Sequence, residues 1–540
     1  MSEENTRITD CFAGLGIVEK VQSIWRRDKG DRRELHTRLP TQVASTSPLK
    51  PESPTPSPHR PVLPVELWID ILQRICKNTL KEYLDQDRHV FSSNPDLYLT
   101  PLTLSHVCQY WRQVIVSHPL FWSNIVVLIG HKSSEFLLET WLARSDATML
   151  SIWVHVPHLF DAKIFFRCIH TLHSHSRRWK AISFSLGDSA VQLWKTIFIT
   201  IESHGEEIVR TWKPLELPAL TDLEVISLGY RYPGKEFEFI SAVCSTAKLQ
   251  SVRIRCLGNA LDYHASSLGE YEPKASTISS LTSLTLTQVR MPSVKTLIAD
   301  LSKTVNLRAL EIHSPLPPFA TFASDDTSAP WNHRYLRTQL DRITNLSVTL
   351  SIGHTHWIST FFQSISLPSL QDLSVSYTGY SVSVHEMIEA SSCNIRKLRL
   401  QITEKDIQKA TTFLACSPSF DHLVDMAIET VHYSHQDTAS GQDDASLSRF
   451  QDFIADLSKE PLLFPRLEKI MLIKCRIADG FLSQLARFRL RNSRLSYLHV
   501  QVDKRIDDHP TDSAVFRELF KSGFHAYIIP SFGRNMSFYA

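Results

Sequence analysis

A short apolar pattern recurs along most of the chain and constrains its fold more than any other feature. The pattern is apolar-x-x-apolar-x-apolar, and the alternation in its second half is typical of a strand with one buried face. Its strict form, with leucine at the first two apolar positions, occurs five times where composition alone predicts about one. The strict segments begin at Leu220, Leu281, Leu307, Leu370 and Leu495. Looser matches begin at Trp179, Leu249, Ile343, Ile395, Leu423 and Leu467.

Helical patterns lie between these predicted strands. Apolar residues spaced at i, i+3, i+4 and i+7 predict two amphipathic helices, at Val294, Leu297, Ile298 and Leu301 and at Phe450, Phe453, Ile454 and Leu457. Three prolines, Pro218, Pro368 and Pro465, stand two residues before a strand leucine, where proline ends a helix and delivers an extended chain. Most successive strands begin 25 to 36 residues apart. This period resembles that of leucine-rich-repeat proteins, without the asparagine ladder of the regular family.

The predicted fold class is α/β, with a small N-terminal all-α module followed by an irregular leucine-rich-repeat solenoid over residues 131–540. One repeat unit cannot cover its own apolar face, so the units stack into a curved parallel sheet with outer helices. Outward-pointing residues then line a concave surface, which is where such proteins bind extended partners. The candidate target-binding residues are Glu224, Arg253, Glu311, Arg399, Tyr497 and His499, with Asp222, Gln250, Thr285 and Ser374 at similar positions.

Two alternatives stay open in this region. Each candidate residue taken singly is equally well explained as part of a solvated strand face. Two long loops, 314–335 and 433–445, interrupt the period and are either recognition loops or tolerated insertions.

Residues 61–130 have a different character. Pro64 suits the first turn of a helix, where its missing N–H has no partner to lose. An apolar stripe follows, formed by Leu67, Ile71, Leu72 and Ile75. A second amphipathic helix is predicted from Leu102 to Ile115, and the chain after Pro119 turns into an apolar strand. So few helices bury only a very small core, and we expect apolar surface to remain for a partner.

Three motifs occur here in order: Leu63-Pro64-x-Glu66-Leu67, then Val107-Cys108-x-x-Trp111-Arg112, then Pro119-Leu120-x-Trp122. Together they resemble the F-box and, more narrowly, the F-box-like proteins of large fungal families. The resemblance implies docking on a Skp-type adaptor of a cullin-RING ubiquitin ligase. By motif position, the adaptor-binding surface or the core beneath it would consist of Leu63, Pro64, Leu67, Ile71, Leu104, Val107, Cys108 and Trp111. The loop from Leu84 to Tyr98 is longer than in a compact F-box, and it would weaken this interpretation if it blocked the adaptor face.

Residues 1–60 predict no packed domain. Apolar residues from Ile17 to Trp25 permit one short amphipathic helix. A segment rich in proline, serine and threonine follows, which predicts an extended, disordered linker. Its Ser-Pro and Thr-Pro pairs, between Ser47 and Pro58, are either phosphorylation sites or ordinary linker sequence.

Composition argues against several classes of function. Lys+Arg 58 against Asp+Glu 56 leaves a net charge of +2, so there is no electrostatic reason to expect a nucleic acid or an anionic membrane as partner. The apolar runs are shorter than the ~20 residues of a membrane span, and the first residues do not resemble a secretory signal. We therefore expect an intracellular protein of the cytoplasm, the nucleus or both. The nine scattered cysteines predict buried free thiols rather than disulfides or structural zinc.

No catalytic motif stands out. The chain has no glycine-rich phosphate loop, no nucleophile elbow and no zinc-protease helix motif. His170 and His173 could share a helix face, but Cys168 and His175 would point elsewhere, so we expect no metal, no cofactor and no enzyme activity.

The predicted function is that of a substrate-recognition subunit of an SCF-type ubiquitin ligase. The F-box would dock on a Skp-type adaptor, and through it on the cullin, while the solenoid binds an unknown target protein. The alternatives are a ligase-independent interaction scaffold on the same solenoid and a hydrolase or transferase on an unfamiliar α/β fold.

Overall fold

The structure is a computed structural model. It describes residues 64–85, 100–129, 133–157, 161–186, 217–227, 248–256, 261–262, 280–287, 289–290, 294–313, 337–349, 355–376, 382–403, 410, 412–414, 417–431, 451–458, 464–475, 477–492, 494–502, 509–521 and 524–530. The chain divides into two compact units. The first comprises Met1–Ser123 with Leu142–Asp146, and the second comprises Asn124–Trp141 with Ala147–Ala540. The predicted N-terminal helix, the loop 84–98 beyond Asp85, and the loops 314–335 and 433–445 lie outside the described residues.

The first unit is helical. Its described elements are α3 (Val65–Asp85), α4 (Thr100–Ser105), α5 (Gln109–Ser117) and the short 3-10 helix η1 (Pro119–Trp122). Pro64 directly precedes α3, and its carbonyl accepts hydrogen bonds from the backbone N–H groups of Leu67 and Trp68. The predicted helix from Leu102 to Ile115 is divided in two, because Cys108 is extended and its Sγ caps α5 by accepting from the N–H of Trp111 at 3.4 Å.

The core of the first unit consists of a few large side chains. Leu72 and Ile115 are fully buried, as is Trp122, whose indole N–H donates to the carbonyl of Ile115 at 2.9 Å. The guanidinium of Arg144 lies over the Trp122 ring, 4.3 Å from its centroid. These contacts join α5, η1 and the segment Leu142–Asp146, so a small number of residues stabilises the unit.

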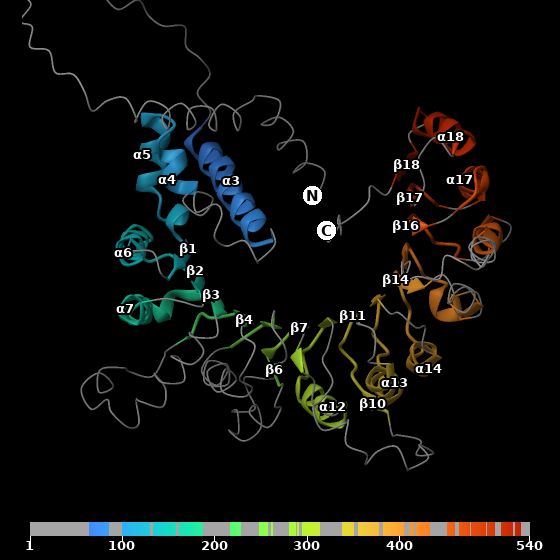
Figure 1. Cartoon of the computed structure of the whole chain (residues 1–540), viewed down its shortest axis with the longest axis horizontal. Helices are drawn as coiled ribbons and strands as arrows, with labels where there is room; N and C mark the ends of the chain where they lie inside the picture. The colour runs from blue at the N-terminus through green and yellow to red at the C-terminus, as the bar shows by residue number, and fades with distance from the viewer. Residues whose placement is uncertain are drawn as a thin grey trace, which may run out of the picture. The chain divides into compact units, whose positions relative to one another are not determined.

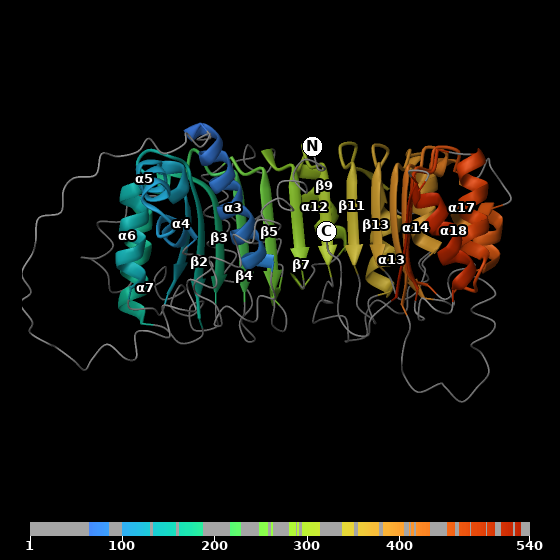
Figure 2. The same cartoon turned by 90° about the horizontal axis from the view of Figure 1, so that it is seen from above.

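The second unit contains a parallel sheet of 14 strands among the described residues. Its strands follow the chain in order, which is the arrangement of a solenoid-like repeat (Figures 1 and 2). They are β1 (Asn124–Leu128), β2 (Leu150–Val156), β3 (Trp179–Leu186), β4 (Asp222–Ser227), β5 (Ser251–Cys256), β7 (Ser283–Thr287), β9 (Ala309–His313), β11 (Asn345–Thr349), β13 (Asp372–Ser376), β14 (Lys397–Thr403), β15 (Asp425–Val431), β16 (Lys469–Cys475), β17 (Tyr497–Val502) and β18 (His525–Pro530).

Helices cover the outer side of this curved sheet (Figure 1). They include α6 (Ser134–Arg144), α7 (Ala162–His173), α12 (Val294–Lys303), α13 (Thr355–Ser364), α14 (Val382–Ser391), α17 (Phe481–Asn492) and α18 (Pro510–Lys521). The short elements are η2 (Ser176–Arg178), η6 (Pro418–Phe420) and two small parallel pairs, β6 (Leu261–Asp262) with β8 (Val289–Arg290) and β10 (Thr338–Gln339) with β12 (Ile365–Ser366).

Eleven of the fourteen strands begin two residues after a predicted pattern start, or at it in the case of Trp179. The leucines of the pattern form buried rows across the sheet. One row passes from Leu223 through Leu310, Leu373 and Leu398 to Leu498 in continuous register. Because these residues are at most a few per cent exposed, the stacked rows are the core of the second unit.

Strand entry is the same from repeat to repeat. From β4 to β16, the carbonyl of the residue before each strand of the large sheet accepts two N–H groups from the next repeat; that of Thr221, for example, accepts from Gln250 at 2.8 Å and Ser251 at 3.0 Å. Hydroxyls reinforce this ladder, as where Thr282 donates to Gln250. Backbone groups and hydroxyls thus join the repeats here, in a chain that lacks the asparagine ladder.

The prolines before the strands occupy tight turns. Pro218, Pro368 and Pro465 each take the second position of a four-residue turn, and the N–H of the strand leucine closes it with a hydrogen bond of 3.1 to 3.3 Å. The predicted role of proline in directing the chain into the strand therefore has a defined geometry.

The described cysteines are free thiols. Cys76, Cys168, Cys393 and Cys475 are buried, whereas Cys108 is exposed. Burial raises the pKa of Cys76 to about 12 and that of Cys168 to about 11, so these thiols stay protonated at neutral pH.

Candidate protein-binding surfaces

The first unit leaves part of its apolar surface open at the start of α3 and at the turn between α4 and α5. Leu67 is 49% exposed and Val107 is 42% exposed, although both are apolar motif positions. Val65 and Tyr110 are also exposed nearby in the sequence. The rings of Trp68 and Trp111 contact each other in a tilted arrangement with centroids 5.5 Å apart, which joins the first turns of α3 and α5.

The eight predicted adaptor-binding residues divide between surface and core. Pro64, Leu67, Val107 and Cys108 are exposed, and Ile71 is partly exposed. Leu104 and Trp111 are buried, so they support the surface from below. Leu63 lies outside the described residues.

The inner face of the sheet, opposite the helices, carries three rows of side chains that run across the strands. The middle row is Val126, Trp153, Ser183, Glu224, Arg253, Thr285, Glu311, Ser347, Ser374, Arg399, Ala427, Met471, His499 and Tyr527. Five of the six predicted target-binding residues lie in this one row, namely Glu224, Arg253, Glu311, Arg399 and His499. The sixth, Tyr497, lies in the neighbouring row two residues earlier.

A polar network occupies the centre of the inner face. The Glu224 carboxylate accepts a hydrogen bond from Ser183 at 2.9 Å and lies 3.6 Å from the guanidinium of Arg253 and 3.5 Å from that of Arg255. On β9, three strands from Glu224, Glu311 accepts a hydrogen bond from Thr285 at 3.0 Å and lies 3.6 Å from the His313 ring.

The neighbours of Glu311 in this network shift the pKa of its carboxyl group. Contact with His313 lowers the pKa of the Glu311 carboxyl, burial opposes that shift, and the hydrogen bond from Thr285 lowers the pKa further. The network is balanced rather than strongly charged, since two arginines face two carboxylates. A partner at this place would be recognised by hydrogen bonds and local charge pairs.

The character of the inner face changes at β16 to β18. Tyr497, His499 and Tyr527 contact one another with ring centroids 6.2 to 6.5 Å apart, and Phe520 of α18 lies 6.2 Å from Tyr527. Tyr527 is 40% exposed and Phe520 is 55% exposed. These rings therefore present an open aromatic surface at the C-terminal end of the sheet.

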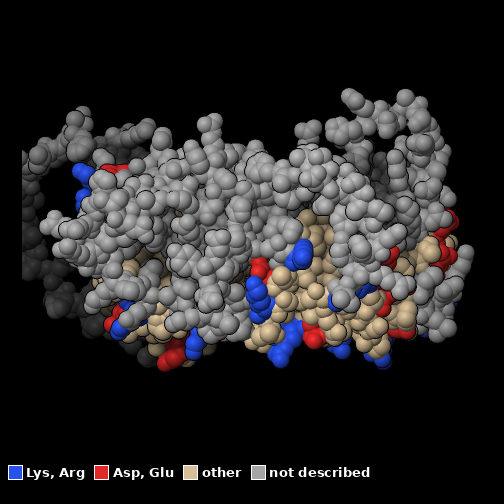
Figure 3. All heavy atoms as spheres, turned by 90° about the horizontal axis from the view of Figure 1, so that it is seen from below, with Lys and Arg blue, Asp and Glu red and all other residues tan. Residues whose placement is uncertain are grey.

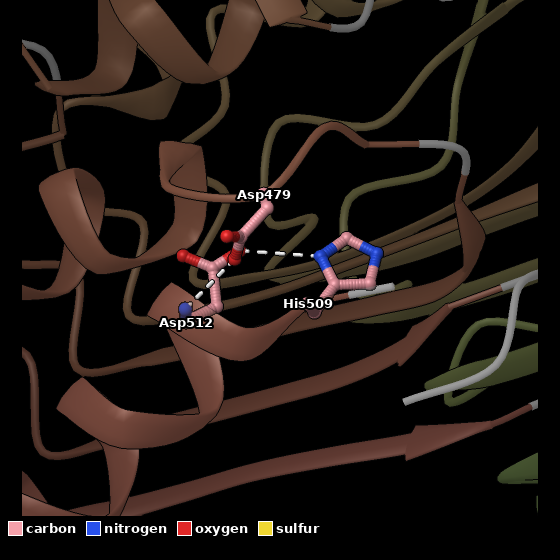
Figure 4. A group of neighbouring side chains, drawn as sticks. All are labelled: Asp479, His509 and Asp512. Atoms are coloured by element: carbon pink, nitrogen blue, oxygen red, sulfur yellow. Dashed lines mark hydrogen bonds and ion pairs between the residues drawn. The ribbon is translucent and has the colours of Figure 1, made fainter. Parts of the chain in front are cut away.

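A group of three residues near this end has the spacing of a metal site. Donor atoms of Asp479, His509 and Asp512 all lie within 4.8 Å of one another (Figure 4). Both carboxylates, however, already cap helices. Asp479 accepts from the N–H groups of Thr511 and Asp512 at 3.0 and 2.9 Å, and Asp512 accepts from the N–H of Ser483 at 2.8 Å. Asp479, which precedes α17, thus caps α18, and Asp512, which belongs to α18, caps α17. These reciprocal caps explain the cluster without a metal.

Surface charge is mixed. On the face shown in Figure 3, basic side chains (Lys, Arg) and acidic side chains (Asp, Glu) are both present among the described residues, interspersed with uncharged ones. The described residues visible on this face form no large patch of basic side chains. Among the described helices, none is long and apolar enough to cross a membrane.

Sequence reasoning missed several residues of these surfaces. Arg255 and His313 were not predicted, although both stand two positions after a predicted residue and so share its strand face. Tyr527 and Phe520 were missed because β18 does not begin with the leucine pattern. The Asp479 cluster has no local motif, because its members come together only when α17 and α18 pack side by side.

Comparisons with known proteins give little support beyond the structure itself. No protein-family model matches this sequence, and no curated protein matches it. Among solved structures, a chain of the crystal structure of the Rad7 and Elc1 complex in yeast aligns with a TM-score of 0.31 and 13% identity, over 77% of this chain and 92% of that chain. A similarity at this level carries no argument about function, and the proposals below are based on the residues themselves.

Proposed function

We propose that this protein is a substrate-recognition subunit of an SCF-type cullin-RING ubiquitin ligase, acting in the cytoplasm, the nucleus or both. The observation that carries the proposal is the open apolar surface of the first unit. Its exposed residues Leu67 and Val107 are among the eight positions that the F-box-like motifs assign to the adaptor-binding surface or to the core beneath it.

Burial explains why this surface would need a partner. Leu72, Ile115 and Trp122 are fully buried, whereas Leu67 and Val107 remain about half exposed. Half-exposed apolar side chains of this kind are suitable contacts for a protein interface. A Skp-type adaptor that covered them would connect the chain to a cullin.

The second unit supplies the complementary role. Its inner face presents three rows of side chains in fixed register, and a stacked parallel sheet holds such rows rigidly. A target protein bound there would be held near the ubiquitin-loaded enzyme that the cullin recruits. Proximity alone raises the rate of transfer, so the chain needs no catalytic residue of its own.

Coexpression with a Skp-type adaptor tests the proposal. We expect the full chain and the adaptor to elute together in size-exclusion chromatography. Leu67→Asp should abolish the complex, because it places a charge in the apolar contact. This change leaves α3 intact, since an acidic residue is favourable near a helix N-terminus.

Phe136→Asp is the matched control, because Phe136 of α6 is an apolar residue that is 69% exposed and stands outside the motifs. It should leave the complex unchanged. If the unaltered chain forms no complex at micromolar concentration, the ligase proposal is wrong, and a scaffold that uses the sheet alone becomes the better interpretation.

A further inference from the structure

The aromatic surface at the C-terminal end of the sheet differs from the rest of the inner face. We define the aromatic patch as Met471 of β16, Tyr497 and His499 of β17, Tyr527 and Ile529 of β18, and Phe520 of α18. The two β18 side chains and Phe520 are exposed, and the other three are partly exposed. No other part of the described inner face brings together so many rings.

The aromatic patch is close to electrically neutral. Asp425 and Lys469, its charged neighbours in the row of Tyr497, have opposite signs. Glu429 and Lys474 form an ion pair of 2.6 Å. Burial lowers the pKa of His499, so its ring is uncharged at neutral pH. Charge complementarity therefore favours an uncharged partner segment over an acidic or basic one.

The distance between side chains along a row indicates which conformation of that segment would fit. Neighbouring strands in a sheet are about 4.8 Å apart, so Met471 and Tyr527, two strands apart in the middle row, are separated by about 9.6 Å. A polyproline II helix returns the same face every three residues, or about 9.3 Å. A fully extended strand repeats about every 6.6 Å and would not match this row.

From these observations we propose that the aromatic patch binds an uncharged, proline-rich segment of the target protein in the polyproline II conformation. The segment runs across β16, β17 and β18, and its residues i and i+3 contact Met471 and Tyr527. Open aromatic rings suit such a segment, because proline rings pack on them and the preformed helix loses little entropy on binding. This inference rests on the proposed function, since it names the class of target.

Fluorescence polarisation with a labelled peptide tests the inference on the full chain. The probe is (Pro-Leu-Pro)₃ with neutral ends, and the comparison peptides are (Gly-Leu-Ser)₃, (Pro-Glu-Pro)₃ and (Pro-Lys-Pro)₃. We expect the first peptide to bind most tightly, because it alone combines the preformed helix with uncharged apolar side chains.

Variants locate the binding. Tyr527→Ala should weaken binding of (Pro-Leu-Pro)₃ about tenfold or more, as expected for a central aromatic contact. Tyr527→Phe should retain most of it, because the ring remains. Val305→Ala, an exposed apolar control in the turn after α12, should change nothing.

Three outcomes would overturn the inference. The first is no binding of (Pro-Leu-Pro)₃, and the second is binding that Tyr527→Ala leaves unchanged. The third is binding that occurs only after Pro48, Pro51 and Pro54 are replaced by serine, which would make the chain's own linker the occupant. These results are separate from adaptor binding, so failure here would leave the adaptor result standing, and failure of the adaptor complex would leave the peptide result standing.

Discussion

The two units of this chain are built on opposite principles. The helical unit depends on a few large side chains that each make several different contacts, such as Trp122 with Ile115 and Arg144. The sheet depends on one small contact repeated from strand to strand, in which each leucine of a row packs between two similar neighbours. Loss of one large side chain should therefore unfold the helical unit as a whole, whereas loss of one leucine should weaken the sheet only locally.

The largest expected effect comes from the core of the helical unit. Trp122→Ala removes a fully buried ring together with its hydrogen bond, at a cost of about 3–5 kcal/mol. We expect this to unfold the first unit and abolish adaptor binding. Hydrogen exchange measured by mass spectrometry should show lost protection throughout α3, α4 and α5.

The matched change in the sheet is Leu373→Ala, at a fully packed position of β13. It should reduce protection in β11, β13 and β14 while leaving the helical unit protected and able to bind the adaptor. If Leu373→Ala also unfolded the helical unit, the two units would not be independent and the comparison would fail.

A medium effect is expected at the helix caps between α17 and α18. Asp479→Ala removes the acceptor of two backbone N–H groups and should cost about 1 kcal/mol in the free energy of unfolding. Asp479→Asn should cost less, because asparagine also caps helices. Chemical denaturation followed by circular dichroism measures both, and added Zn²⁺ should stabilise neither the parent nor the variants. A clear stabilisation by Zn²⁺ would show that the cluster is a metal site after all.

The smallest effect concerns Glu311 in the polar network. Its pKa is lowered in the folded chain, so its ionised form stabilises the fold above the ordinary pKa, and this contribution is lost as the pH falls through the lowered pKa. As the pH is lowered from about 5 to about 3, the unfolding temperature of the parent should therefore fall slightly more steeply than that of Glu311→Gln. Because Glu311 is partly exposed, the difference will be small. Identical slopes would mean that the network does not stabilise the charged carboxylate.

The sheet was the more predictable of the two units. Every predicted pattern start is followed by a strand of the sheet, because the period-two alternation of apolar residues reflects burial on one face directly. The same alternation placed Glu224, Arg253 and Glu311 on the opposite face. β2 was not predicted, although Met149, Ile152 and Val154 match the loose form of the pattern.

Features that the apolar pattern does not reveal were less predictable. The break at Cys108 depends on a sulfur cap that apolar periodicity does not reveal. In the sequence around β18, Gly523 and Ala526 occupy the positions where other repeats have leucine, so neither the strand nor its Tyr527 was predicted. The reciprocal caps of Asp479 and Asp512 form only when two helices lie side by side, and sequence spacing does not predict that arrangement.

The division of labour between the units is the central claim, and hydrogen exchange of the full chain with and without a Skp-type adaptor tests it most directly. We expect new protection at the first turns of α3 and at the α4–α5 turn around Val107, with β16, β17 and β18 unchanged. Protection that appeared in β16 to β18 but not in the helical unit would contradict the claim, because the sheet would then be the surface that holds the adaptor.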